Sequence, residues 1–478
     1  MANALPRAAL IIFLALMPAT RVNAAEQPRR FGDGFGINIK VERITWPELD
    51  QIAALGFRRV RLGISWFEVE KEKSVYRFDY AVPRDPAAPD YPESYVFNHD
   101  AMVAAIRERG LHLDVTLNQG NTLYTGEPVN IAPSDQPPSL RLRAPSTQES
   151  RAGFAAFATA TVKYFQEKHG SAYFTWLIWN EPDFPGGWPP QTNAAEFGQL
   201  LHDTCTAIRA AVPTANIMGP ALGAHGNGDI KLDFIKGLFT TANPLPCLDA
   251  FTIHPYRAYA PETATKTYAE VAHLLAPWQP KDKPPVPLAV DEWGYSINRH
   301  RGEVPKPARW RNYSGEEQAA LMLRMYLTNL AAGLPLTTIY DWRDRGTDPY
   351  EWEDHFGVIG FKGEEKPALK MFRVTWPLLL DRQLLAPVPL PHCPPTLHAL
   401  RFGPHTDDAK NWLILWTETE LHTLTLKGEP EKAQNIFGEI VKWQHGSNNI
   451  EVKPQPLLLA EHPSRLLSLS CNGNTKAP

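Results

Sequence analysis

The chain has 478 residues, of which 43% are hydrophobic and 21% are charged. That is enough apolar material for one large domain and a smaller one. Its 48 basic and 52 acidic residues are interspersed and leave a net charge of −4. A nucleic-acid partner is therefore not expected, because it would need a basic patch.

The N-terminal segment predicts export. Arg7 precedes an apolar run of ten residues, Ala8 to Met17, and small residues follow at 22–24. This run is too short to cross a bilayer, which takes about 20 residues, but it is typical of a cleaved export signal. We expect residues 1–24 to be a signal peptide, and the mature chain to be periplasmic or secreted with no stable membrane span. An uncleaved anchor is the alternative.

Residues 31–383 alternate short aliphatic or β-branched runs with amphipathic helical stretches. Such alternation indicates parallel βαβ units, and eight units in about 350 residues predict a (β/α)8 TIM barrel. A doubly wound open sheet is the alternative, but no GxGxxG or P-loop motif follows the first run. The predicted strands are 35–39, 59–64, 111–117, 174–179, 217–222, 250–254, 288–292 and 337–340, and the clearest helices are 47–55, 98–109, 149–167, 194–211 and 316–332.

The predicted loops differ in length at the two ends of the barrel. Helix-to-strand connections are short, as at residues 56–58 and at Gly110. Strand-to-helix connections are long and rich in proline and aromatic residues, as at 66–95, 119–146 and 342–364. Catalytic sites of TIM barrels lie on the strand-to-helix side. We therefore expect the active face there.

Residues 384–478 have a different pattern, with short alternating apolar runs separated by turn residues. This predicts a small antiparallel β-sandwich that either packs against the barrel or binds carbohydrate. The runs are 412–416, 421–426, 439–443, 457–459 and 466–469.

Four cysteines fit an exported protein and allow three pairings. The pairs Cys205–Cys247 and Cys393–Cys471 would each stay within one predicted domain. None of the four lies in a CxxC motif or beside a suitable histidine. A metal or redox role is not expected.

Two carboxylates end predicted core strands. Glu181 follows the fourth strand directly before Pro182, and Glu292 ends the seventh. One such residue can be an ordinary surface group, but two, both flanked by tryptophan, indicate chemistry. A carboxyl pair across a barrel mouth suits glycoside hydrolysis, in which the distance between the two groups separates retaining from inverting enzymes. This chemistry needs no cofactor. The first strand also lacks the HxH pattern of a metal-dependent hydrolase.

The motif Trp179-Asn180-Glu181-Pro182-Asp183 resembles the acid/base signature of glycoside hydrolase clan A, in the form found in family 39. The resemblance implies retaining hydrolysis of a β-linked poly- or oligosaccharide, with Glu181 as acid/base and Glu292 as nucleophile. The chain also resembles periplasmic glycosidases of exopolysaccharide systems. A β-xylosidase-like exo-enzyme is the second interpretation, and a non-catalytic sugar-binding or polysaccharide-assembly barrel is a third, from a different class.

The resemblance carries over to five supporting positions. Asn180 would bind the sugar 2-hydroxyl, and Arg61 would hold Glu292 ionised. His254 and Tyr256 match the His-x-Tyr motif of the clan, whose tyrosine contacts the nucleophile. Trp342 would offer a platform for a sugar ring. The other active-face tryptophans, either subsites or loop core, are Trp66, Trp188, Trp310 and Trp352.

Two features depart from the family pattern. Asp291 precedes the expected nucleophile, where family 39 has a small or hydroxyl residue. Because neighbours in a regular strand point to opposite sides, we expect only one of this pair, Glu292, to face the substrate. The third strand ends in residues 118–120, Asn-Gln-Gly, without the histidine of the clan. The identity of the sugar therefore stays open.

Overall fold

The computed structural model describes residues 30–83, 98–131, 139–225, 228–258, 260–300, 312–385, 388–403, 410–441 and 449–471. The predicted signal peptide and Trp310 lie outside these residues. Within the described ranges, no helix has the length and apolar character needed to cross a membrane.

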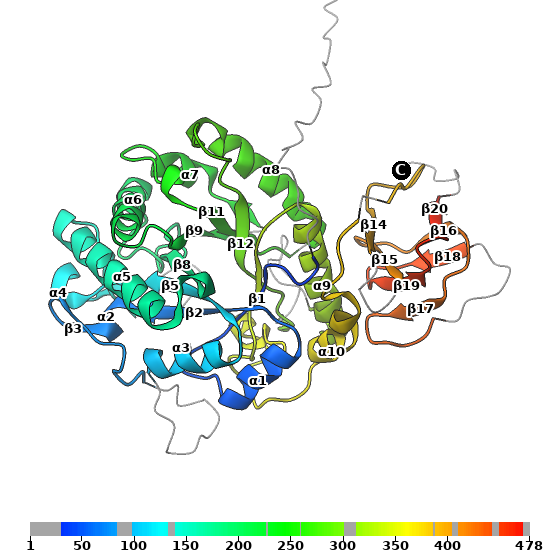
Figure 1. Ribbon diagram of the computed structural model, residues 1–478, viewed down its shortest axis with the longest axis horizontal. Helices are drawn as coiled ribbons and strands as arrows, with labels where there is room; N and C mark the ends of the chain where they lie inside the picture. The colour runs from blue at the N-terminus through cyan, green and yellow to red at the C-terminus, as the bar shows by residue number, and fades with distance from the viewer. Residues whose placement is uncertain are drawn as a thin grey trace, which may run out of the picture.

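Eight parallel strands close into a barrel, which confirms the predicted (β/α)8 fold (Figure 1). Pairing of β8 with β9 and of β13 with β1 closes the sheet, so the doubly wound alternative is wrong. Most residues of these strands are buried, as expected where both faces of a parallel sheet are covered. They are β1 (Phe35–Asn38), β2 (Arg59–Ser65), β5 (His112–Asn118), β8 (Phe174–Ile178), β9 (Asn216–His225), β11 (Ala250–His254), β12 (Leu288–Trp293) and β13 (Thr337–Ile339).

The helices surround this barrel, and several begin at caps that the sequence encodes. Thr45 with Glu48, and Ser314 with Glu317, form capping boxes that satisfy free N–H groups of the first turn. The longer helices are α1 (Trp46–Ala54), α3 (His99–Glu108), α5 (Gln148–His169), α6 (Ala194–Ala211), α7 (Leu232–Leu238), α8 (Ala264–Leu275), α9 (Gly315–Ala331) and α10 (Pro367–Leu379).

Short elements decorate the connections between these helices and strands. Most of them lie in the long strand-to-helix loops, on the predicted active face. They are α2 (Trp66–Val69), α4 (Thr122–Thr125), β3 (Glu70–Glu72), β4 (Val75–Tyr76), β6 (Val129–Ile131), β7 (Ser139–Arg141), β10 (Asp229–Ile230) and the 3-10 turns η1 (Ser171–Tyr173), η2 (Leu245–Cys247), η3 (Pro261–Thr263), η4 (Ala276–Trp278) and η5 (Trp352–His355).

The C-terminal region forms two antiparallel sheets, as predicted for a β-sandwich. Of the predicted run 439–443, residues 442 and 443 lie outside the described residues. Residues 439–441 form no strand, and Ile440 makes only an isolated bridge to Gln434. One sheet contains β14 (Leu397–Phe402), β15 (Asn411–Thr417), β19 (Leu457–Glu461) and β17 (Lys432–Asn435), and the other β18 (Asn449–Val452), β16 (His422–Lys427) and β20 (Ser468–Ser470).

One face of the four-stranded sheet packs against the barrel beside α9 and α10 (Figure 1). Phe402 and Trp416 belong to the same buried cluster as the barrel residue Trp376. At this interface buried Glu262 accepts hydrogen bonds from Arg324 of α9, at 2.7 and 2.9 Å, and from the Trp416 indole, at 2.6 Å. These contacts favour the packing role. The boundary between residues 383 and 384 stays a prediction.

Two disulfides join Cys205 to Cys247 and Cys393 to Cys471. Of the three possible pairings, these are the local ones. The first links α6 to η2 on the barrel, and the second links the segment before β14 to the end of β20. Each bond therefore closes a loop within one structural unit.

Candidate active site

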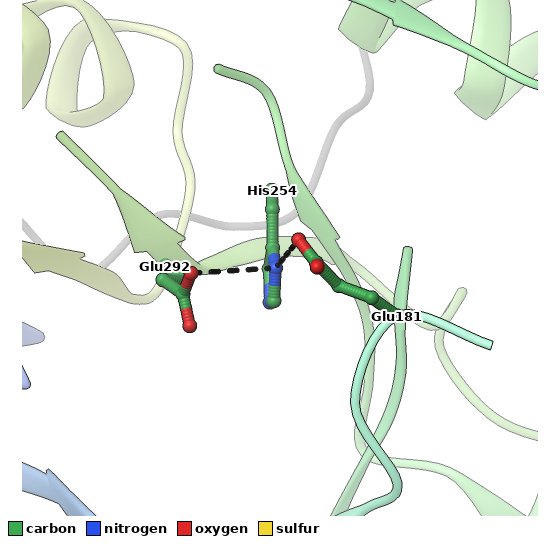
Figure 2. A group of neighbouring side chains, drawn as sticks. All are labelled: Glu181, His254 and Glu292. Carbon is green, nitrogen blue, oxygen red and sulfur yellow. Dashed lines mark hydrogen bonds and ion pairs between the residues drawn. The ribbon is translucent and has the colours of Figure 1, made fainter. Parts of the chain in front are cut away.

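Three side chains meet at the carboxyl ends of the strands. Glu181 follows β8, His254 ends β11 and Glu292 lies near the end of β12. The Glu181 side chain is 28% exposed and that of Glu292 is 13% exposed, so both open to the barrel mouth. One carboxylate oxygen of each, and one ring nitrogen of His254, lie within 4.8 Å of one another (Figure 2).

A tight turn after β8 presents Glu181. Trp179 and Glu181 have φ angles of 74° and 47°, a region that non-glycine residues adopt mainly where the surroundings enforce it. The Glu181 N–H is donated to the carbonyl of Ala221 on the next strand at 2.9 Å. A Cβ at Gly187 would lie 1.8 Å from the Glu181 carbonyl oxygen, so this turn requires glycine. Backbone contacts therefore fix the base of the Glu181 side chain.

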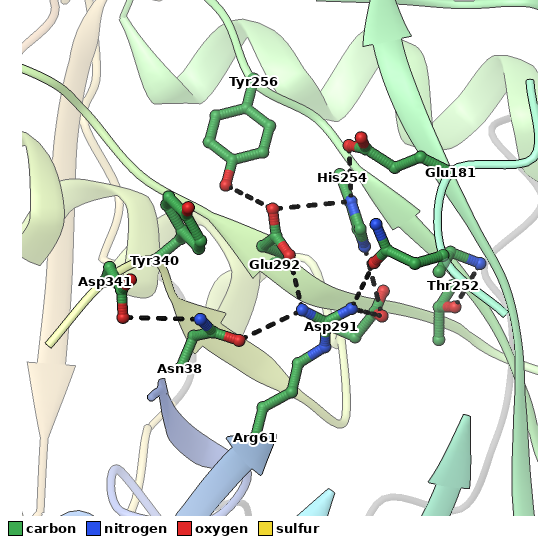
Figure 3. A network of polar contacts seen from close by, with 12 residues as sticks. Asn38, Arg61, Glu181, Thr252, His254, Tyr256, Asp291, Glu292, Tyr340 and Asp341 are labelled. Carbon is green, nitrogen blue, oxygen red and sulfur yellow. Dashed lines mark hydrogen bonds and ion pairs between the residues drawn. The ribbon is translucent and has the colours of Figure 1, made fainter. Parts of the chain in front are cut away.

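The Glu292 carboxylate is held by charge and hydrogen bonds. Its Oε2 pairs with the Arg61 guanidinium, and its Oε1 accepts a hydrogen bond of 2.7 Å from the Tyr256 hydroxyl (Figure 3). Burial alone would raise the pKa of this carboxyl, but the charges of His254, Arg61 and Lys40 outweigh it and lower the pKa to about 2. Glu292 is therefore ionised at neutral pH, as a nucleophile needs to be.

Asn180 shares this network. Its Oδ1 accepts a hydrogen bond of 2.7 Å from Arg61, so one guanidinium connects Asn180 with Glu292. A cavity of about 500 Å³ opens beside Asn180, between the ends of β5 and β8 and the β6–β7 hairpin. Its lining mixes polar groups, such as Asn118 and Gln119, with the apolar Leu140. Mixed linings of this kind suit a sugar ring.

Asp291 also reaches the barrel interior, contrary to expectation. Between Val290 and Trp293 the pairing of β12 with β13 shifts register, so β12 carries an extra residue there. As a result Asp291 lies 3.5 Å from Arg61, the cation that also pairs with Glu292. Asp291 is 0% exposed. Of the two acids, only Glu292 opens to the mouth.

His254 lies between three carboxylates (Figure 3). Its Nδ1 is 2.9 Å from Glu181 Oε1 and 3.9 Å from Glu292 Oε1, and its Nε2 is 3.2 Å from Asp291 Oδ2. Burial alone would lower the pKa of this imidazole, but the charges of Asp291 and Glu292 outweigh it and raise the pKa to about 10. His254 is thus an imidazolium. The spacing of Glu181, His254 and Glu292 would also suit a metal ion, which would have to displace the Nδ1 proton of His254.

The sugar platform expected at Trp342 is not present. Trp342 is 1% exposed, and its indole N–H is donated to Glu48 at 2.8 Å. The buried Glu48 carboxylate needs this partner, along with Arg343, so the ring belongs to the packing behind the site. Trp66 and Trp188, at 0% and 1% exposure, are likewise loop core. Trp352 is half-buried.

Three residues near Glu292 were not predicted. The Tyr340 hydroxyl is donated to Glu353 Oε2 at 3.0 Å, and Lys40 Nζ lies 4.7 Å from the Tyr340 ring centre. Burial raises the pKa of Glu353 to about 7, although Lys40 and Arg345 oppose the change. Glu353 lies in the long 342–364 loop, where no motif marks it. Its position could not be inferred from spacing.

The fold of this chain is similar to that of solved glycoside hydrolase structures. No protein-family model matches the chain, and neither does any curated protein sequence. Among solved structures, a family 39 glycoside hydrolase from the gut symbiont Bacteroides cellulosilyticus WH2 matches with a TM-score of 0.66 and 18% identity, over 91% of this chain and 82% of that one. The chain has the fold of family 39 glycoside hydrolases. The predicted resemblance is confirmed at that level.

Two further structures extend the likeness. A monomeric β-xylosidase from Caulobacter crescentus CB15 matches with a TM-score of 0.57 and 12% identity, over 92% of this chain and 97% of that one. A family 30 endoxylanase from Clostridium papyrosolvens C71 matches with a TM-score of 0.55 and 12% identity, over 91% of this chain and 97% of that one. All three alignments include both the barrel and most of the C-terminal region, since each covers more than nine tenths of this chain.

Proposed function

We propose that this protein is an exported, retaining glycoside hydrolase that cleaves a β-linked poly- or oligosaccharide. The observation that carries the proposal is the separation of the two carboxylates, whose nearest oxygens lie within 4.8 Å. Retaining enzymes keep their carboxyl groups about 5–5.5 Å apart, whereas inverting enzymes need about 6.5–9.5 Å to admit a water molecule.

The roles of the two acids follow from their surroundings. Glu292 is held ionised by Arg61 and accepts the Tyr256 hydroxyl hydrogen bond, so it acts as the nucleophile that attacks the anomeric carbon. Glu181 is the more exposed of the two and protonates the leaving oxygen. In the second step Glu181 removes a proton from water, the water oxygen bonds to the anomeric carbon, and Glu292 is released.

Asn180 is the third substrate contact. Its Oδ1 is occupied by Arg61, which leaves the amide N–H groups to bind the sugar 2-hydroxyl. A hydrogen bond at that position strengthens in the transition state. The cavity beside Asn180 then accommodates a neighbouring sugar unit, which favours an oligomeric substrate.

Export and substrate class rest on separate support. The N-terminal apolar run and the two disulfides favour an oxidising compartment such as the periplasm. The family 39 and family 30 relatives in fold include a β-xylosidase and an endoxylanase. Together these favour an exported or cell-surface polysaccharide, including an exopolysaccharide, as the substrate.

The test is release of reducing ends from a panel of β-linked polysaccharides and aryl β-glycosides. Wild type, Glu181→Gln and Glu292→Gln are compared, with Glu149→Gln as control, because the Glu149 side chain is 73% exposed and pairs with Lys73 rather than with either carboxylate. Release from polysaccharide should fall about 100-fold or more in both site variants and stay at the wild-type rate in the control. Tight binding without release, unchanged in the site variants, would instead favour a sugar-binding or polysaccharide-assembly barrel.

A further inference from the structure

We propose that Asp291 is a positioning residue that keeps the proton of the His254–Glu181 pair on His254, so that Glu181 is free to act as a base on the covalent intermediate. This inference rests on the proposed function and assigns a role to an acid that the family resemblance leaves unexplained. It is carried by the geometry around Asp291 and His254.

Asp291 is a buried anion with few partners. It is 0% exposed, and within the described part of the chain no backbone N–H and no hydroxyl group donates a hydrogen bond to it. The cations that face it are His254, at 3.2 Å, and Arg61, at 3.5 Å. A buried carboxylate is costly unless opposite charges compensate it. Asp291 therefore favours a charged His254.

Both ring nitrogens of His254 face carboxylate oxygens. Neutral imidazole carries one N–H and one lone pair, so one of its nitrogens would direct a lone pair at an anion. Once Glu181 has given up its proton, only the imidazolium suits both sides. The charged groups around the ring are Glu181 after β8, Asp291 and Glu292 from β12, and Arg61 from β2, which lies beyond Asp291.

The charge of His254 matters because the negative charge in the site moves during the proposed reaction. The first step begins with Glu181 carrying the proton that it donates, while the carboxylates of Glu292 and Asp291 face the cations Arg61 and His254. In the first step the glycosidic C–O bond breaks, and the leaving oxygen takes its electron pair and the Glu181 proton. A Glu292 oxygen bonds to the anomeric carbon in its place, so Glu292 becomes a neutral ester. The negative charge thus moves to Glu181, which lies 2.9 Å from His254.

At that stage a single proton lies between His254 Nδ1 and Glu181 Oε1. If the proton moves to Glu181, the base needed to deprotonate water is lost. Asp291 faces Nε2 of His254, the ring nitrogen on the side opposite Glu181. The negative charge of Asp291 therefore stabilises the positive charge of protonated His254. Arg61 alone cannot do this, because a second cation disfavours the imidazolium.

Asp291→Asn tests this, because it keeps the shape of the side chain and removes its charge. With an aryl glycoside whose second step limits turnover, the acid limb of kcat should move up by about 1 to 3 pH units, and the glycosyl-enzyme should accumulate. Azide, a nucleophile that needs no general base, should restore turnover. In a His254→Gln background the same change should not move the limb further.

Asp114→Asn is the control, because Asp114 is also 0% exposed and pairs with Arg59 away from the site. It should lower stability without moving the pH profile or responding to azide. Equal losses of kcat and kcat/KM in Asp291→Asn at every pH, with no azide rescue, would overturn the proposal.

A second measurement needs neither Asp291→Asn nor catalytic turnover. ¹⁵N NMR of histidine-labelled wild-type protein at pH 7.5, assigned with His254→Gln, should show both ring nitrogens of His254 protonated. A neutral His254 would overturn this proposal even if the enzyme hydrolyses glycosides. A charged His254 in a protein that hydrolyses none would instead count against the proposed function.

Discussion

Replacing Tyr256 by phenylalanine isolates one contact of the proposed nucleophile. The Tyr256 hydroxyl lies 2.7 Å from Glu292 Oε1, and the residue is 5% exposed, so the phenyl ring keeps its packing and only the hydrogen bond is lost. A hydrogen bond to a charged group contributes about 1.5–3 kcal/mol, which corresponds to about 1 to 2 pH units in the pKa of its acceptor.

The direction of the effect follows from which form the hydroxyl stabilises. It favours ionised Glu292, whose pKa lies at about 2, so its loss should raise that pKa to about 3–4. A nucleophile must be ionised, so activity is retained above the pKa and lost below it. The acid limb of kcat/KM should therefore rise by the same amount. Measured between pH 3 and 7, the ratio of kcat/KM at pH 4 to that at pH 6.5 should fall in Tyr256→Phe.

Tyr268→Phe is the matched control. Tyr268 is 6% exposed and donates a hydrogen bond of 2.7 Å to Asn329, away from the site. Its loss should reduce the free energy of unfolding by about 1 kcal/mol and leave the pH profile unchanged. If Tyr256→Phe loses stability while its acid limb stays at the wild-type pH, the hydroxyl does not set the ionisation of Glu292 and the reasoning fails.

Three other predictions concern stability. Cys393→Ala/Cys471→Ala opens a 78-residue loop and should lower the free energy of unfolding in urea by about 4 kcal/mol; an unchanged midpoint would contradict it. Glu262→Gln leaves buried Arg324 without its anion and should cost about 3–5 kcal/mol in thermal unfolding, whereas exposed Glu316→Gln should cost almost nothing. The pKa of His254 is about 10 in the folded protein against 6.5 ordinarily, so its stabilising contribution is complete below pH 6.5 and disappears as pH rises to 10. Wild type should thus lose more unfolding free energy between pH 6 and 10 than His254→Gln, and equal losses would refute this.

The barrel could be predicted because its buried parallel strands are strongly patterned. Each of the eight predicted runs coincides with a strand to within a few residues, as 250–254 does with β11. The site could be predicted in part for the same reason. A strand end places its side chain at the mouth, so Glu181, Glu292 and His254 meet as their positions imply.

What escaped prediction depends on tertiary context. The extra residue in β12 that turns Asp291 inward depends on pairing with β13, which a single strand does not encode. Trp342 follows the last barrel strand, as a sugar platform would. Its indole N–H is instead donated to buried Glu48, which lies 294 positions earlier in the sequence. The strands β14, β17 and β18 were missed because their sequences, LHALRF, KAQN and NIEV, carry polar residues or are too short to show a sustained alternation.

Retaining hydrolysis at this site requires that Glu292 forms a covalent bond to the sugar. The most direct measurement is mass spectrometry of the wild-type protein after incubation with a 2-deoxy-2-fluoro glycoside of the sugar that the substrate panel identifies. We expect one added glycosyl group per chain, on the peptide that contains Glu292, and none in Glu292→Gln. Attachment at Asp291, or continued sugar release from the natural substrate with no adduct and an inverted product, would contradict it.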